Sequence, residues 1–176
     1  RHRMMRERGI VRWIVGSLAV VLVLLPGCRV NYSFTGGDVG AARTVSVELF
    51  ATGSPLATPQ SAQIFTETLR DLLLAQTPLK LAQQDGDVHY SGSITGYDVQ
   101  PVSIQANETA ALNRLTLTVR VDYVNTLEPA KNNSSSYTRF ADYESSQDLV
   151  SVEERLVEQI SDQLAQDIFD RTLGNW

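Results

Sequence analysis

The alternation of apolar and polar residues is strictest over residues 112–125. Apolar side chains occupy every second position there, and polar side chains fill the positions between them: Leu115, Leu117, Val119, Val121 and Tyr123 against Arg114, Thr116, Thr118, Arg120 and Asp122. A period of two residues is that of a β-strand with one covered and one solvated face. We therefore expect an antiparallel sheet with helices on a single side.

Three further segments show the strand pattern less cleanly. Residues 44–50 alternate, and residues 87–105 alternate until a change of phase at Gly96, which indicates a bulge. A partner strand is expected at 137–143, after a polar loop over 128–136.

Two segments repeat their apolar residues at the helical spacing. The first begins after Thr58-Pro59, a good cap followed by a proline suited to the first helical position, and ends at Thr77-Pro78. In the second, apolar residues recur every four positions from Val152 to Ile168. Ser151 and Glu154 have capping-box spacing at its start, and Gly174 marks its end.

The order strand, helix, three strands, helix predicts an α+β fold for residues 44–176. We expect a two-layer sandwich in which an about four-stranded, mostly antiparallel sheet carries two helices on one face. Residues 28–43 mix small and polar residues and are expected to form a spacer before this domain.

The N-terminal region has the three-part layout of an export signal. Basic residues precede the apolar run 13–25, which is shorter than the roughly 20 residues of a membrane-spanning helix. Leu25-Pro26-Gly27-Cys28 resembles a lipobox, although proline two residues before the cysteine is unusual. We therefore expect residues 1–27 to be a cleaved lipoprotein signal peptide, with translation starting at Met4 or Met5. The alternative is a plain signal peptide that a cysteine happens to follow.

Cys28 is the only cysteine of the chain, so it cannot form an internal disulfide, and we expect it to be lipidated. A diacylglycerol thioether with an acylated (for example palmitoylated) amine would anchor the protein stably, because two or more acyl chains suffice. Arg29 follows where a retention signal for the inner membrane would carry aspartate. We expect the protein at the periplasmic face of the outer membrane.

Composition argues against several function classes. Without residues 1–27 the chain keeps 10 Lys and Arg (15 less 5) and 19 Asp and Glu (20 less 1), a net charge of −9. That acidity disfavours nucleic-acid binding, which depends on neutralising phosphates. The same region has a single histidine, His89, and no motif of a known catalytic or metal site. We expect no enzyme activity, no metal and no cofactor besides the covalent lipid, and interpret His89 as a surface strand residue.

Arg114 and Arg120 are the candidate binding residues. They share the polar face of the predicted strand 112–125, about 20 Å apart at ~3.4 Å per residue. Guanidinium groups bind phosphates bidentately, and lipopolysaccharide is the phosphate bearer of a bacterial envelope. The alternative is a solvated sheet face with cross-strand ion pairs.

Three strings resemble one known family. The stretch 107–120 (NETAALNRLTLTVR), the stretch 140–148 (FADYESSQD) and the ending Gly174-Asn175-Trp176 resemble the Bacteroidetes branch of LptE, the lipopolysaccharide-assembly lipoproteins. The resemblance implies two helices on a four-stranded sheet and a protein that is not an enzyme. It also implies a plug inside the β-barrel LptD that helps this barrel assemble and deliver lipopolysaccharide to the cell surface.

Two other functions fit the residues less well. An outer-membrane lipoprotein acting as a binding adaptor for another periplasmic or envelope complex would explain the anchor and the fold, but not the family strings. An envelope hydrolase would need a nucleophile and a base close to His89.

Overall fold

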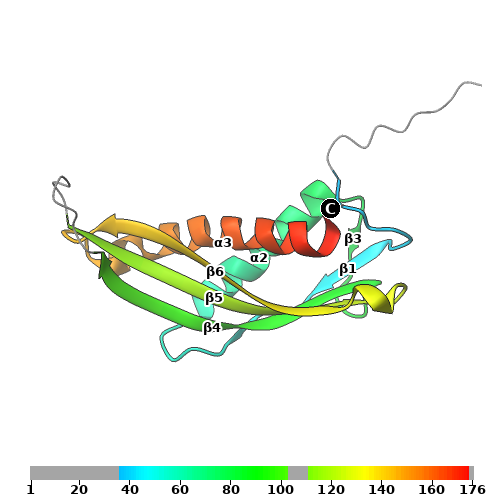
Figure 1. Cartoon of the computed structure of the whole chain (residues 1–176), viewed down its shortest axis with the longest axis horizontal. Helices are drawn as coiled ribbons and strands as arrows, with labels where there is room; N and C mark the ends of the chain where they lie inside the picture. The colour runs from blue at the N-terminus through cyan, green and yellow to red at the C-terminus, as the bar shows by residue number, and fades with distance from the viewer. Residues whose placement is uncertain (1–35, 103–110, 175–176) are drawn as a thin grey trace, which may run out of the picture. The chain divides into compact units, whose positions relative to one another are not determined.

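The computed structural model describes residues 36–102 and 111–174 (Figure 1). The chain divides into two units, Arg1–Phe34 and Thr35–Trp176, and all described residues belong to the second. The predicted signal peptide, the lipobox and Cys28 lie outside the described residues. In the described part of the chain, no helix is both long enough and apolar enough to cross a membrane.

The second unit contains one mixed sheet of six strands with two helices on one of its faces (Figure 1). The strands are β1 (Thr44–Val47), β2 (Ala51–Thr52), β3 (Lys80–Leu81), β4 (Val88–Val102), β5 (Leu112–Asn125) and β6 (Asn133–Glu144). Their order is β3-β1-β4-β5-β6, and β2 pairs with β4 beyond the end of β1. The predicted α+β class and the two helices on one face are confirmed.

The predicted number and direction of the strands need correction. β1 is parallel to both β3 and β4, and β2 is parallel to β4, while only β4–β5 and β5–β6 are antiparallel. The helix between β1 and β3 explains the parallel pair, because such a crossover brings the chain back in the same direction. β2 and β3 have two residues each, too few to show a period in the sequence.

β5 has the predicted bounds, and its alternating burial follows the sequence pattern. β4 changes register between Ile94 and Gly96, which confirms the bulge predicted at this glycine. Tyr90 and Ile94 before the bulge and Tyr97 after it are therefore all buried on the helix side, although their sequence phase differs.

The predicted strand 44–50 is interrupted at Glu48–Phe50. Phe50 turns into the core, where its N–H donates to the Thr66 hydroxyl at 3.1 Å and its ring meets Phe65 edge-on. Gly92 of β4 makes room for this ring. A Cβ at Gly92 would lie 2.9 Å from the Phe50 ring and still closer to the backbone oxygen of Arg120. The φ angle of Gly92, +155°, also favours glycine.

The helices are α2 (Pro59–Gln76) and α3 (Leu149–Leu173). Thr58 caps α2 as predicted, and Ser61 completes a reciprocal capping box. The capping box predicted at Ser151 is wrong. α3 begins earlier, after Asp148, so Ser151 already lies in its first turn and its hydroxyl donates to the Asp148 carbonyl at 2.6 Å. Gly174 ends α3 as predicted.

β6 begins earlier than predicted. Residues expected in a polar loop up to Ser136 pair with β5 from Asn133 onward, and only a short 3-10 turn, η1 (Pro129–Lys131), joins the two strands. Asn125 holds this turn, because its side-chain oxygen accepts from the N–H groups of Leu127 and Glu128. β6 ends the sheet order, and an edge strand tolerates polar residues on both sides.

The core lies between the inner face of the sheet and the two helices. It includes the inward positions of β5 and the apolar stripes of α2 and α3. Every tyrosine in the described residues takes part in this core or packs against it: Tyr90, Tyr97, Tyr123, Tyr137 and Tyr143. Residues 36–43 of the predicted spacer also contact the domain, since Asp38 N–H donates to the Leu173 carbonyl and Ala42 is buried.

Candidate functional site

The side of β4, β5 and β6 that faces away from the helices is polar, and we call it the outer face. In the described part of the chain no helix covers it (Figure 1). The strand register brings hydroxyl groups together over its centre and charged groups toward its ends. Its residues on the two antiparallel pairs include Ser91, Ser93, Asp98, Gln100, Arg114, Thr116, Thr118, Arg120, Asp122, Ser134, Ser136, Thr138, Phe140 and Asp142.

Arg114 lies on the outer face with its guanidinium already engaged. Nε and Nη2 donate to the two carboxylate oxygens of Asp142, the residue directly opposite on β6, at 2.7 and 2.9 Å. The guanidinium carbon also lies 3.6 Å from the centre of the Phe140 ring. The hydrogen bonds from Arg114 lower the pKa of the Asp142 carboxyl and raise the pKa of the guanidinium. Arg114 is therefore a cross-strand ion pair stacked on an aromatic ring.

Arg120 is more open. Its side chain is 60% exposed, and its Nε lies 3.9 Å from the carboxylate of Asp122 on the same strand. Nη2 donates to the Ser134 hydroxyl at 3.2 Å. Both contacts are longer than those of Arg114, so a phosphate could approach Arg120 without first breaking a bidentate pair.

A third arginine, which sequence reasoning missed, also has a defined partner. Arg139 of β6 lies on the helix side and donates from Nε and Nη2 to Asp167 of α3 at 2.6 and 2.7 Å. Arg139 follows Thr138, which lies on the outer face, so strand alternation alone could have predicted that Arg139 points to the helix side. Its pairing with α3 depends on the tertiary fold. Arg139 therefore ties the edge strand to the helix layer.

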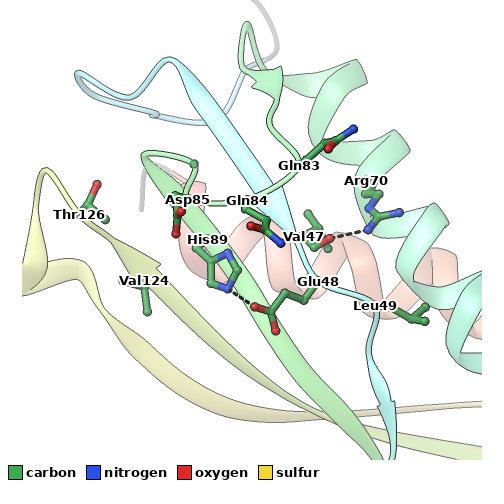
Figure 2. A pocket seen from close by; sticks show the side chains of 11 residues that line it. Val47, Glu48, Leu49, Arg70, Gln83, Gln84, Asp85, His89, Val124 and Thr126 are labelled. Carbon is green, nitrogen blue, oxygen red and sulfur yellow. Dashed lines mark hydrogen bonds and ion pairs between the residues drawn. The ribbon is translucent and has the colours of Figure 1, made fainter.

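A surface pocket of about 720 Å³ lies at the end of the sheet where β1 meets β4 (Figure 2). Its residues come from β1 and the break after it, from α2, from the loop after β3, and from the ends of β4 and β5. They are Val47, Glu48, Leu49, Arg70, Gln83, Gln84, Asp85, Gly86, His89, Val124 and Thr126. A second pocket, between the N-terminal turns of α2 and α3, has only about 140 Å³.

His89 is more than a surface strand residue. The Ser46 hydroxyl lies 2.8 Å from its Nδ1, and Glu48 Oε1 lies 3.3 Å from its Nε2 (Figure 2 shows the second contact). Gly86 N–H donates to the same hydroxyl at 3.0 Å, so Ser46 links the loop after β3 to His89.

This Ser–His–Glu contact does not have the geometry of a nucleophile. Ser46 is 1% exposed, because the loop that contains Gly86 covers it, so a substrate has no access to its oxygen. The serine also contacts Nδ1, the nitrogen that the carboxylate holds in a Ser–His–Asp triad. The arrangement is that of a polar network that fixes the loop on β1.

Within residues 36–102 and 111–174, no three His, Cys, Asp or Glu side chains converge to hold a metal ion. The described side chains therefore offer two kinds of surface for binding: the outer face, with paired charges and hydroxyls, and the pocket at the edge of β1.

A family model for lipopolysaccharide assembly, LptE, matches residues 42–172, which include every described strand and helix. The chain belongs to the LptE family. This confirms the resemblance to LptE found in three strings of the sequence. The family consists of lipopolysaccharide-assembly lipoproteins and not of enzymes. A search of curated proteins finds no match.

Several solved structures are similar to this chain at low sequence identity. A minor lipoprotein from Acinetobacter baumannii is 18% identical, with a TM-score of 0.45 over 76% of this chain and 94% of that one. A putative neuraminyllactose-binding hemagglutinin homolog from Helicobacter pylori is 9% identical, with a TM-score of 0.49 over 77% and 85%. The rare lipoprotein B of Shewanella oneidensis is 13% identical, with a TM-score of 0.42 over 72% and 93%. Similarity at this level supports no statement about ligands or partners.

Proposed function

We propose that this LptE-family protein is an outer-membrane lipoprotein that plugs the LptD β-barrel and helps it assemble for lipopolysaccharide transport to the cell surface. The observation that carries the proposal is the family match over residues 42–172. The lipid on Cys28 would hold the protein at the periplasmic face of the outer membrane, where a tether raises its effective concentration beside the barrel.

The outer face supports a role as a plug. The lumen of a large barrel is polar, so a protein lodged in it needs a polar surface that does not leave charges unpaired when water is excluded. On the outer face Arg114 is neutralised by Asp142, and Arg120 lies near Asp122. The hydroxyls of Thr118 and Thr138 contact each other at 2.9 Å across the strands. This surface can therefore lose water at a low cost.

Depletion of the protein tests the assembly role. We expect cells without it to accumulate misassembled LptD and to become permeable to large hydrophobic antibiotics. Barrel folding is measured by the mobility of LptD on unheated gels, and permeability by antibiotic sensitivity. Normal barrel levels together with an intact permeability barrier would contradict the proposal.

The anchor is tested at Cys28. We expect radiolabelled palmitate to be incorporated into the protein and the label to disappear in Cys28→Ala. A matched substitution, Ser46→Ala, leaves residues 25–28 intact and should retain the label. Labelling of the Cys28→Ala protein would contradict lipidation at this residue.

Lipopolysaccharide binding is proposed for Arg120 and Arg114. We expect the double variant Arg114→Glu with Arg120→Glu to bind lipopolysaccharide more weakly while remaining folded. Of the single variants, Arg120→Glu should have the larger effect, because Arg114 is already held by Asp142. Binding is measured with the purified lipoprotein in detergent, and folding by circular dichroism. Unchanged binding by the double variant would leave both arginines as ion pairs of a solvated face.

The second candidate is a binding adaptor for another periplasmic or envelope complex. The pocket at the edge of β1 favours it, since a binding surface at the end of the sheet could serve any protein partner. Purification from detergent extracts separates the two functions by the identity of the partner, which is a β-barrel under the first and a periplasmic or inner-membrane protein under the second.

A further inference from the structure

We infer that the free sheet edge formed by Val47, the last residue of β1, and the next two residues to Leu49 is a strand-addition site for an extended segment of a partner protein. The inference goes beyond the proposed function, because it concerns a different surface from the outer face and does not depend on which protein supplies the segment.

The sheet edge is incomplete at this point. Pairing of β1 with β3 ends at Val45 and Leu81, and the last backbone contact is the Ala82 N–H donating to the Val45 carbonyl at 2.8 Å. The chain then leaves the edge, and its loop crosses β1, where Gly86 N–H donates to Ser46. Among the described residues, no backbone continues the column of β3 beside Val47 and Leu49. The Arg70 side chain contacts Val47 there, and the pocket of about 720 Å³ includes both Val47 and Leu49 in its lining.

Backbone groups on this edge lack partners. The carbonyls of Arg43 and Val45 accept hydrogen bonds from Lys80 of β3 and from Ala82, the residue after β3. Every second residue of a strand directs its N–H and carbonyl to the same side, so those of Val47 also point toward the edge where β3 lies. Among the described residues, no hydrogen bond engages the N–H of Val47 or the N–H and carbonyl of Leu49. An added strand would pair with these groups as one strand of a sheet pairs with the next.

Arg70 supplies a hydrogen-bond donor at this edge. One terminal nitrogen of Arg70 donates to the Val47 carbonyl, which replaces the donor that a neighbouring strand would have supplied. Its Nε is buried and has no partner among the described residues. Figure 2 shows Arg70 and Leu49 on the side of β1 that faces away from His89 and β4. An added segment would contact the Arg70 guanidinium where it meets the Val47 carbonyl.

Exposed leucines line the same edge. Leu49 is 66% exposed and Leu81 of β3 is 50% exposed, and both belong to the edge. Leu74, 38% exposed, lies one helical turn from Arg70 on the same side of α2. Apolar side chains beside unpaired backbone groups favour a protein segment with alternating apolar residues. The carboxylates of Glu48 and Asp85, which also line the pocket, disfavour a small anion.

The test uses the full lipidated chain in detergent micelles and a short blocked peptide of alternating threonine and valine. We expect the peptide to slow hydrogen exchange of the Val47 and Leu49 amides by about tenfold or more, and to leave the Leu56 amide unchanged. The same peptide with N-methylated amides, which cannot pair as a strand, should have no effect.

Variants separate the backbone from the side chains. Leu49→Pro removes an N–H that has no partner in the free protein, and it should abolish peptide binding. Leu49→Thr keeps the N–H and should still bind, and Leu56→Pro serves as the matched control at another exposed leucine. Arg70→Lys should weaken binding by about three- to tenfold, the effect of losing one hydrogen bond.

Three results would overturn the inference. The first is no protection of the Val47 and Leu49 amides, or equal protection by the N-methylated peptide. The second is protection at β6 instead, which would indicate unspecific addition to the longer free edge. The third is protection of the same amides without peptide through dimerisation, which would assign the edge to a second copy of the chain. None of these results affects the test of barrel assembly.

Discussion

Neighbouring residues of β5 belong to two different surfaces. Leu115, Leu117 and Val119 are fully buried under α2 and α3, whereas Thr116 and Thr118 between them lie on the outer face, half-buried only by other strands. On the inner face each side chain is fixed by packing in three dimensions. On the outer face, side chains contact only their strand neighbours. Most of the stability therefore resides on the inner face, and the residues of the outer face can vary to fit a partner.

The largest expected difference between the faces comes from adjacent substitutions in β5. Leu117→Ala should lower the free energy of unfolding by about 2–5 kcal/mol, because it leaves a cavity beneath the helices. Thr116→Ala on the outer face should cost under about 1 kcal/mol, a loss of strand propensity alone. Urea unfolding of both variants measures the difference. Equal losses would mean that the outer face also carries the fold.

Alkaline pH should act on the inner face alone, because all the described tyrosines lie there. Burial raises the pKa of Tyr90, Tyr97, Tyr123 and Tyr137 above the value of about 10 in an unfolded chain. Stability from these neutral tyrosines is complete below pH 10 and is lost as pH rises above it, at roughly 1.4 kcal/mol per pH unit for Tyr90.

Tyr90→Phe is the variant that checks this effect. It should cost about 0.5–1.5 kcal/mol at neutral pH, since the Tyr90 hydroxyl bonds to Thr172 at 2.8 Å, and it should reduce the loss above pH 10. Unfolding followed at several alkaline pH values, with tyrosinate absorbance as a second signal, measures both. An unchanged slope in Tyr90→Phe would contradict the role of its burial.

The smallest effect is expected from the ion pair on the outer face. Hydrogen bonds from Arg114 lower the pKa of the Asp142 carboxyl, so the pair stabilises the protein above the unfolded pKa and is lost as pH falls through the lower, folded pKa. Asp142→Asn should remove this acid dependence with little change at neutral pH. Urea unfolding between neutral and acidic pH checks it. A large loss at neutral pH would show that the outer face is coupled to the core.

The prediction from the sequence was most accurate for elements that a single local pattern determines. β5 obeys strict alternation and has the predicted bounds, and α2 starts at the cap and proline that predict it. The break at Glu48–Phe50 could not be predicted in this way. It depends on the hydroxyl of Thr66 and on the space left by Gly92, which are distant in sequence and meet only in the fold.

The candidate site was predictable to the same extent. Alternation placed Arg114 and Arg120 on one face, but their partners depend on the register between β5 and β6, which the short η1 turn sets. The polar residues before Tyr137 indicated a loop, and that hid the pairing of Arg120 with Ser136. The edge of β1 had no sequence signal, since it arises where a two-residue strand stops.

Purification of the lipidated protein from detergent extracts, followed by mass spectrometry, tests the central claim most directly. The account predicts that LptD, a large outer-membrane β-barrel, co-purifies in a stable complex, and that Arg120→Glu does not release it because the family role rests on the whole domain. Recovery of a periplasmic or inner-membrane protein in place of any barrel would contradict it.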